Sequence, residues 1–193
     1  MRLICAVALL LLSGCQPADP GAKAATEAAA KPSLSARPKP VNKAVLDAEG
    51  VTFDSPAGKT QEFDFGATRA EVDAMAERMF GPPDELAENG ECGAGPMQFS
   101  RYGPLTLHFQ DGKLVGWFAR EGDEVVTTDG IRPGTLMRDL KVARSARMIE
   151  GSTLEGEFDY LAADGHTIGG FAKGEGRDAK IESLYAGANC FFR

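Results

Sequence analysis

Apolar side chains recur at a helical spacing in the first half of the chain. Thr68 and Glu71 stand three residues apart, as in a capping box. Glycine and two prolines follow at residues 81–83, and these residue types end helices. The apolar residues between these signals lie on one face of a helix, and they are Val72, Met75, Ala76, Met79 and Phe80. The pattern predicts an amphipathic helix.

The stretch "LTLHFQDGKLVGWFA" predicts a β-hairpin, because Asp111 and Gly112 suit the two left-handed positions of a type I′ turn. If the residues of the two strands pair outward from this turn without a bulge, the hairpin has two faces with different side chains. The face expected to line the core pairs Leu105 with Phe118, Leu107 with Gly116 and Phe109 with Leu114. The other face pairs Thr106 with Trp117, His108 with Val115 and Gln110 with Lys113.

The second of these faces is the expected docking surface. It combines polar side chains with the only tryptophan of the chain, and its residues are Thr106, His108, Val115 and Trp117. The first face already supplies the apolar stripe that a helix needs, so the second is expected to stay open. An aromatic ring among polar side chains is typical of an interface hot spot. The alternative is that "GVTFD" or the second half of the chain covers Trp117.

Two short motifs occur twice in the same order. "GATRAEV" at residues 66–72 aligns without gaps with "GTLMRDL" at 134–140, and "DGKLVGW" at 111–117 aligns with "DAKIESL" at 178–184. Because a fixed period is the signature of repeated units, we interpret the chain as a tandem repeat.

The two predicted repeats span about residues 62–120 and 130–193, and the predicted fold class is α+β. Each repeat is expected to be a short helical start packed on an antiparallel sheet. In the second repeat, strands are expected near residues 157–161, 166–172 and 180–186.

This pair of units resembles the β-lactamase-inhibitor-protein-like fold, whose single-unit relative is the small lipoprotein of the outer-membrane β-barrel assembly machinery. The resemblance covers about residues 62–193. The stretches "ECGAGPM", "LTLHFQDGKLVGW" and "AGANCFFR" are similar to those of a group of exported proteins from alphaproteobacteria. In the tandem inhibitor fold the sheets form a concave surface that grips a partner protein. The resemblance therefore implies a binding role for the Trp117 face.

An apolar run at the N-terminal end of the sequence is too short to cross a membrane. It extends from Leu3 to Leu12 after the basic Arg2, whereas a spanning helix needs about 20 residues. The length and the basic start predict a signal peptide, residues 1–14.

The end of this run, "LSGC" at residues 12–15, resembles the lipobox of bacterial lipoproteins. The resemblance implies cleavage after residue 14 and acylation of Cys15, whose acyl chains then anchor the protein in the membrane. Gln16 is not the aspartate that retains lipoproteins in the inner membrane, so we expect an outer-membrane address facing the periplasm. An ordinary secretory signal with a coincidental cysteine is the alternative.

Residues 15–48 are expected to form an alanine- and proline-rich tether after the lipid anchor. They hold few large apolar side chains, so they cannot bury enough surface to offset the entropy of ordering. The remaining residues, 49–193, are expected to form one compact domain, because about 145 residues suffice for a single core.

Cysteine content and charge narrow the possible chemistry. Once Cys15 is acylated and the signal removed, Cys92 and Cys190 are the remaining thiols. An oxidising compartment predicts one disulfide between them, with a redox-active pair as the alternative. The chain has 28 acidic and 21 basic residues and a net charge of −7, which disfavours nucleic acid as a partner.

Motifs for catalysis are missing from the sequence. His108 and His166 lack neighbours at zinc-ligand spacing, and no nucleophile motif occurs. We therefore expect no catalytic residue, no metal and no cofactor. The favoured function is a non-catalytic envelope lipoprotein that docks an envelope protein, with a peptidoglycan fragment as the alternative partner. The alternative is an enzyme acting on cell-wall or lipid material, with a site assembled from distant residues.

Overall fold

The computed structural model describes residues 43–55, 58 and 60–191, all within one compact unit, Lys39–Arg193. The predicted signal peptide, Cys15 and most of the predicted tether lie outside the described residues. The described part is mixed α and β, with two sheets, two α-helices and a predominance of strands. Within it, neither helix combines the length and the apolar character needed to cross a membrane.

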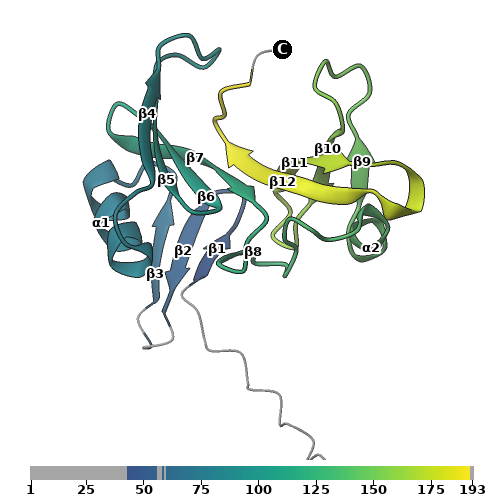
Figure 1. The fold of residues 1–193 in the computed structure, drawn as a ribbon, viewed down its shortest axis with the longest axis horizontal. Helices are drawn as coiled ribbons and strands as arrows, with labels where there is room; N and C mark the ends of the chain where they lie inside the picture. The colour runs from purple at the N-terminus through teal and green to yellow at the C-terminus, as the bar shows by residue number, and fades with distance from the viewer. Residues whose placement is uncertain (1–42, 56–57, 59, 192–193) are drawn as a thin grey trace, which may run out of the picture. The chain divides into compact units, whose positions relative to one another are not determined.

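The smaller sheet has four strands in the order β3-β2-β1-β8 (Figure 1). They are β1 (Lys43–Leu46), β2 (Gly50–Asp54), β3 (Thr60–Asp64) and β8 (Val125–Thr127). Ala44 and Leu46 of β1 are buried, since alternate residues of a strand face the core. The boundary expected between tether and domain at residue 49 is therefore wrong, because β1 already belongs to the compact unit.

The larger sheet has eight strands in the order β4-β5-β6-β7-β12-β11-β10-β9. Its first half holds β4 (Glu85–Asn89), β5 (Met97–Tyr102), β6 (Leu105–Gln110) and β7 (Lys113–Arg120). Its second half holds β9 (Ala146–Met148), β10 (Glu157–Leu161), β11 (Thr167–Lys173) and β12 (Lys180–Gly187). The last three lie where strands were expected in the second repeat. Antiparallel pairing of β7 with β12 joins the halves.

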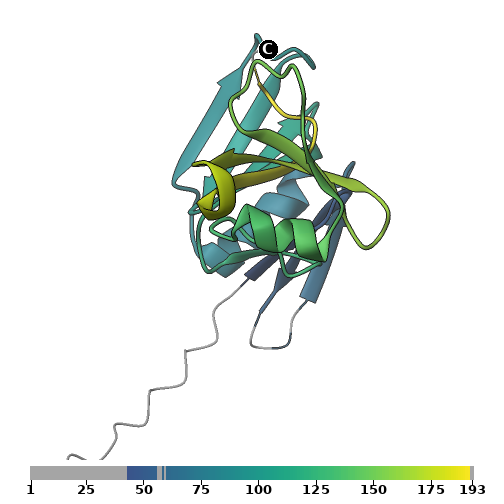
Figure 2. The same cartoon turned by 90° about the vertical axis from the view of Figure 1, so that its right-hand side faces the viewer.

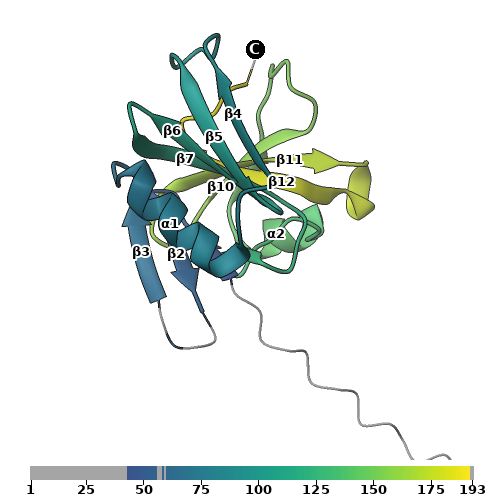
Figure 3. The ribbon, with the colours of Figure 1, turned by 60° about the vertical axis from the view of Figure 1, so that its left-hand side comes forward.

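One helix precedes each half of the larger sheet. Helix α1 (Arg69–Phe80) lies beside β2 and β3 in Figure 3, and α2 (Met137–Ala143) lies on the opposite side of β12 from residues 188–191 in Figures 1 and 2. A short 3₁₀ turn, η1 (Gly176–Asp178), precedes β12.

Helix α1 confirms the predicted amphipathic pattern. The Thr68 side chain accepts a hydrogen bond from the Glu71 amide, and Gly81 ends the helix with a positive φ. Of the five predicted apolar residues, Phe80 is half-buried and the other four are buried.

The backbone connects each helix start to the last strand of its half in the same way. The Gly66 amide donates to the Leu114 carbonyl, and the Gly134 amide donates to the Ile181 carbonyl, both at 2.7 Å. Residue 68 forms an isolated bridge with residue 113, and residue 136 forms one with residue 180.

The predicted hairpin forms, but the predicted register along β7 is wrong. Asp111 and Gly112 both have positive φ, as a type I′ turn requires. Phe109 pairs with Leu114 as expected, whereas Leu107 pairs with Trp117. A β-bulge between these pairs places one extra residue in β7, and one extra residue moves every later side chain to the other face.

Because of the bulge, Trp117 lies in the core and not on the expected docking surface. Its side chain is 0% exposed, and its indole Nε1 donates to the Asp47 carbonyl at 2.8 Å. Val51 and Phe53 of β2 belong to the same buried cluster. The N-terminal strands thus cover the tryptophan, which is the alternative that the sequence left open.

Candidate functional site

The outer face of the eight-stranded sheet is the face opposite Trp117, and it carries a group of half-buried aromatic rings. Directly paired residues point to the same side of a sheet, so Phe118 shares this face with Thr106 and Tyr185. Phe99 shares it with His108. We call the following residues the aromatic cluster: Phe99, Phe118, Phe171, Tyr185 and Phe191.

Phe191 lies at the centre of this cluster. Its ring centre is 6.2 Å from that of Phe118, 5.1 Å from that of Phe171 and 4.9 Å from that of Tyr185. All three contacts are edge-to-face, the arrangement that aromatic quadrupoles favour. Phe191 thereby connects residues from both halves of the sheet.

Phe191 reaches the cluster because residues 188–191, the crossing segment, return over the outer face after β12. The Ala188 amide donates to the Val115 carbonyl at 2.8 Å. A Cβ on Gly116 would lie 2.3 Å from the Ala188 carbonyl oxygen, so only glycine permits this close approach. The missing side chain of Gly116 therefore leaves room for the crossing segment.

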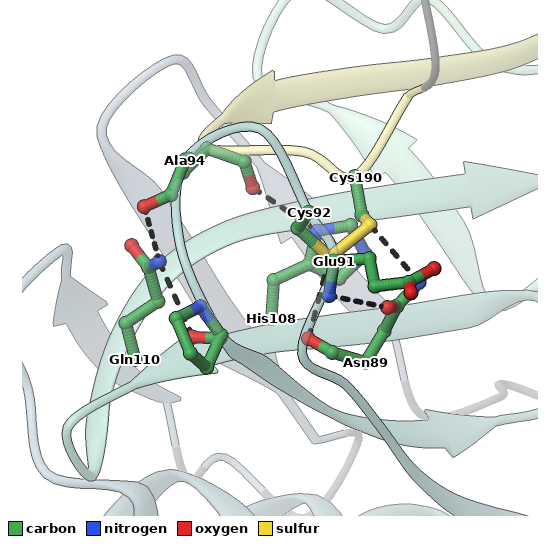
Figure 4. Close-up of a disulfide and its surroundings, with 9 residues drawn as sticks. Asn89, Glu91, Cys92, Ala94, His108, Gln110 and Cys190 are labelled. Atoms are coloured by element: carbon green, nitrogen blue, oxygen red, sulfur yellow. Dashed lines mark hydrogen bonds between the residues drawn. A yellow bond between two sulfur atoms is a disulfide. The ribbon is translucent and has the colours of Figure 1, made fainter.

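The crossing segment is tied to the first half by the Cys92–Cys190 disulfide, which confirms the predicted bridge (Figure 4). Cys92 lies in the loop between β4 and β5, and Cys190 directly precedes Phe191. The side-chain amide Nδ2 of Asn89 donates to Cys190 Sγ at 3.5 Å. The bridge therefore fixes the position of Phe191 over the sheet.

His108 lies beneath the crossing segment and is 5% exposed, although the predicted docking surface to which it belongs was expected to stay open. Its Nδ1 lies 3.1 Å from the Ala188 carbonyl oxygen, which can only accept, so Nδ1 carries the proton. Burial lowers the pKa of His108 to about 4, and the hydrogen bond to Ala188 opposes this shift only in part. The imidazole is neutral at pH 7.

We expect the free energy of unfolding to fall as the pH is lowered from about 6.5 to about 4. His108 has a folded pKa below its unfolded pKa of 6.5, so in this window the unfolded chain binds more protons and acid favours unfolding. The shift corresponds to roughly 3 kcal/mol. Urea unfolding between pH 4 and 7 should show a steeper loss for the native chain than for His108→Gln.

His166→Gln is the matched control for this experiment, because His166 is exposed on the turn before β11. That variant should keep the steep pH dependence of the native chain. An identical pH dependence in the native chain and His108→Gln would contradict the assignment of this effect to His108.

A buried carboxylate fixes the end of the cluster on the second half. Glu157 is 2% exposed and accepts hydrogen bonds from the Tyr185 hydroxyl, at 2.8 Å, and from the Ser152 hydroxyl. Tyr185 lies flat over Gly169, where a Cβ would come within 2.4 Å of the ring. These contacts hold the tyrosine ring in place beside Phe171 and Phe191.

Of the four predicted binding residues, the structure places only two together on the outer face. Thr106 and His108 lie on the outer face, Val115 lies at the bulge, and Trp117 lies on the inner face. The aromatic residues of the cluster were not predicted as a site. One signal for the shifted register was present in the sequence, since an isolated glycine within a strand, here Gly116, often marks a bulge.

The described residues contain no candidate metal centre. Among them, no group of three or more histidine, cysteine, aspartate or glutamate side chains is arranged to hold a metal ion.

A comparison of the chain with family models, with curated proteins and with solved structures finds no match in any of the three.

Proposed function

We propose that this protein is a lipid-anchored, non-catalytic binding module of the bacterial outer membrane that docks an envelope protein on the periplasmic side. The observation that carries this proposal is the aromatic cluster on the outer face. Aromatic side chains dominate the energetics of protein interfaces, and here the disulfide and the Tyr185–Glu157 hydrogen bond hold them in position. Preorganised rings lose little entropy when a partner binds.

The proposal includes two tandem repeats of the kind found in the β-lactamase-inhibitor-protein-like fold. Each half of the larger sheet follows one helix, and in both halves four strands come after this helix. The matching bonds from Gly66 and Gly134 support this interpretation. Residues 66 and 134, and likewise 114 and 181, stand at the offsets that relate the two sequence motifs.

Site-specific crosslinking in living cells tests the docking surface. A photo-reactive benzoylphenylalanine at position 101, on the outer face beside Thr106, should give one discrete crosslinked protein. The same group at position 142 is the control, because Val142 is 90% exposed on α2, away from the outer face. The same products from both positions would contradict docking through the outer face.

Removing an aromatic ring from the cluster should weaken this interaction strongly. We expect Phe118→Ala and Phe171→Ala each to lower the affinity roughly thirtyfold or more, because a hot-spot side chain contributes at least about 2 kcal/mol. Affinity is measured with the partner that the crosslinking identifies, and urea unfolding checks that each variant is folded. Val142→Ala should bind like the native chain. Equal affinity for all three variants would place the interface elsewhere.

Anchoring by acyl groups is tested through Cys15, in the part of the chain outside the described residues. Cys15→Ala should move the protein from the membrane fraction to the soluble fraction of the envelope, because no acyl chain can then be attached. Fractionation and mass spectrometry of the N-terminal peptide measure this. Cys5→Ala, a cysteine change within the predicted signal peptide, should leave the protein at the membrane. A membrane-bound Cys15→Ala protein cleaved after residue 14 would contradict the lipid anchor.

A further inference from the structure

The outer face has a small depression between the crossing segment and the strands of the first half. Its volume is about 260 Å³, and the rings of Phe99, Phe118 and Phe191 contribute to its lining together with Thr106, His108 and Arg120. Pockets for whole small molecules are usually larger, about 300 to 1,000 Å³. The volume suits a single apolar side chain.

The charge of the depression differs from that of the chain as a whole. The chain has 28 acidic residues, yet none of the residues that line the depression is acidic. His108 is neutral at pH 7, because burial lowers its pKa to about 4. Arg120 is therefore the one lining residue that is charged at neutral pH.

Arg120 has no anionic partner within the described residues. Its guanidinium lies over the Phe118 ring, 5.2 Å from the ring centre, and among the described side chains it makes neither an ion pair nor a hydrogen bond. Arg101 on β5, two strands away from β7, differs in this respect, because it is paired with Glu85 at 3.1 Å. A guanidinium is suited to a carboxylate, which it can bind through two parallel hydrogen bonds.

We propose that this depression binds the C-terminal residue of the partner protein, with an apolar side chain between Phe99, Phe118 and Phe191 and its carboxylate on Arg120. A terminal residue carries both groups on one Cα, which matches the short separation between the Phe118 ring and the Arg120 guanidinium. An internal residue would need a carboxylate from a neighbouring side chain, and neighbours in an extended chain point to opposite sides. This inference rests on the proposed function, since it specifies which part of the partner is recognised.

Three small probes test the recognition of a terminal carboxylate. They are N-acetylphenylalanine, its uncharged amide, and acetyl-aspartyl-phenylalaninamide, which carries its carboxylate on the neighbouring side chain. Each is titrated into the full ¹⁵N-labelled chain with the disulfide formed, and binding is followed at the amide resonances of residues 106, 118 and 120. N-acetylphenylalanine should bind about fivefold more tightly than the other two, the factor expected for one solvent-accessible ion pair.

Variants of Arg120 and Arg101, which both lie on the outer face, assign this preference. Arg120→Gln should bind the acid and the amide equally, and Arg120→Lys should keep part of the preference, because it keeps the charge but loses the planar fork. Arg101→Gln is the matched control and should keep the full preference. The inference is overturned if no probe binds, if acid and amide bind the native chain equally, if Arg120→Gln keeps the preference, or if the aspartyl probe binds as tightly as the acid.

The failure of this inference can be told apart from the failure of the proposed function. If crosslinking from position 101 captures a protein but the probes show no preference for the acid, the outer face docks proteins without reading their terminus. If the probes behave as expected but no protein is captured, the depression recognises a carboxylate and the proposed docking of an envelope protein is wrong.

Discussion

A chain carrying both Cys92→Ala and Cys190→Ala is expected to have a free energy of unfolding about 4 to 5 kcal/mol below that of the native chain. The two cysteines are 98 residues apart in sequence, and a crosslink that closes a loop of this length removes much of the entropy of the unfolded chain. Urea unfolding, with the midpoint and the slope both fitted, measures the difference.

Reduction of the native chain is the internal control for this variant. The reduced native chain and the double variant should unfold at similar urea concentrations, because both lack the same crosslink. A loss below about 1 kcal/mol in both would contradict the chain-entropy account and would show that the native bridge stores compensating strain.

The second large effect is expected at Trp117, in the core under the N-terminal strands. Trp117→Ala should lower the free energy of unfolding by about 3 to 5 kcal/mol, because it removes a large buried side chain and leaves a cavity. It also leaves the Asp47 carbonyl without its indole donor. Circular dichroism is the suitable probe, since Trp117 is the only tryptophan and its fluorescence disappears with the substitution.

Two further variants make this prediction specific. Trp117→Phe keeps a ring in the core but loses the hydrogen bond, so it should cost about 1 to 2 kcal/mol. Phe118→Ala, the next residue along β7 but on the half-buried outer face, should destabilise the fold less than Trp117→Ala. A larger effect at Phe118 than at Trp117 would contradict the register of β7.

Local patterns predicted those parts of the fold that depend on neighbouring residues. Helix α1 followed from its capping residues and apolar spacing, and the turn at Asp111 and Gly112 followed from the backbone angles that these residues adopt. The strands β10, β11 and β12 were also placed correctly within a few residues. Each of these signals is contained within one short stretch of sequence.

The binding face depended on contacts that no local pattern contains. Glycine is needed at position 116 of β7, beside the bulge, because Ala188, far away in sequence, passes close to it. Without knowledge of that contact, an uninterrupted alternation of the two faces is the simplest interpretation of β7. That interpretation places Phe118 in the core and Trp117 on the outer face, which is the reverse of the arrangement in the structure. Phe191 joins the aromatic cluster through a segment that forms no regular strand and is fixed by a disulfide, so strand patterns could not place it.

The strand order of the larger sheet has a consequence for how the chain folds as it is synthesised. β12 lies at the centre of this sheet, between β7 and β11, although it is made after both. A nascent chain that ends before residue 180 has two separate groups of strands, each with an additional unpaired edge. Such edges are prone to pair with other chains. Synthesis of β12 therefore removes both exposed edges, because β7 and β11 then each pair with β12 inside a single sheet.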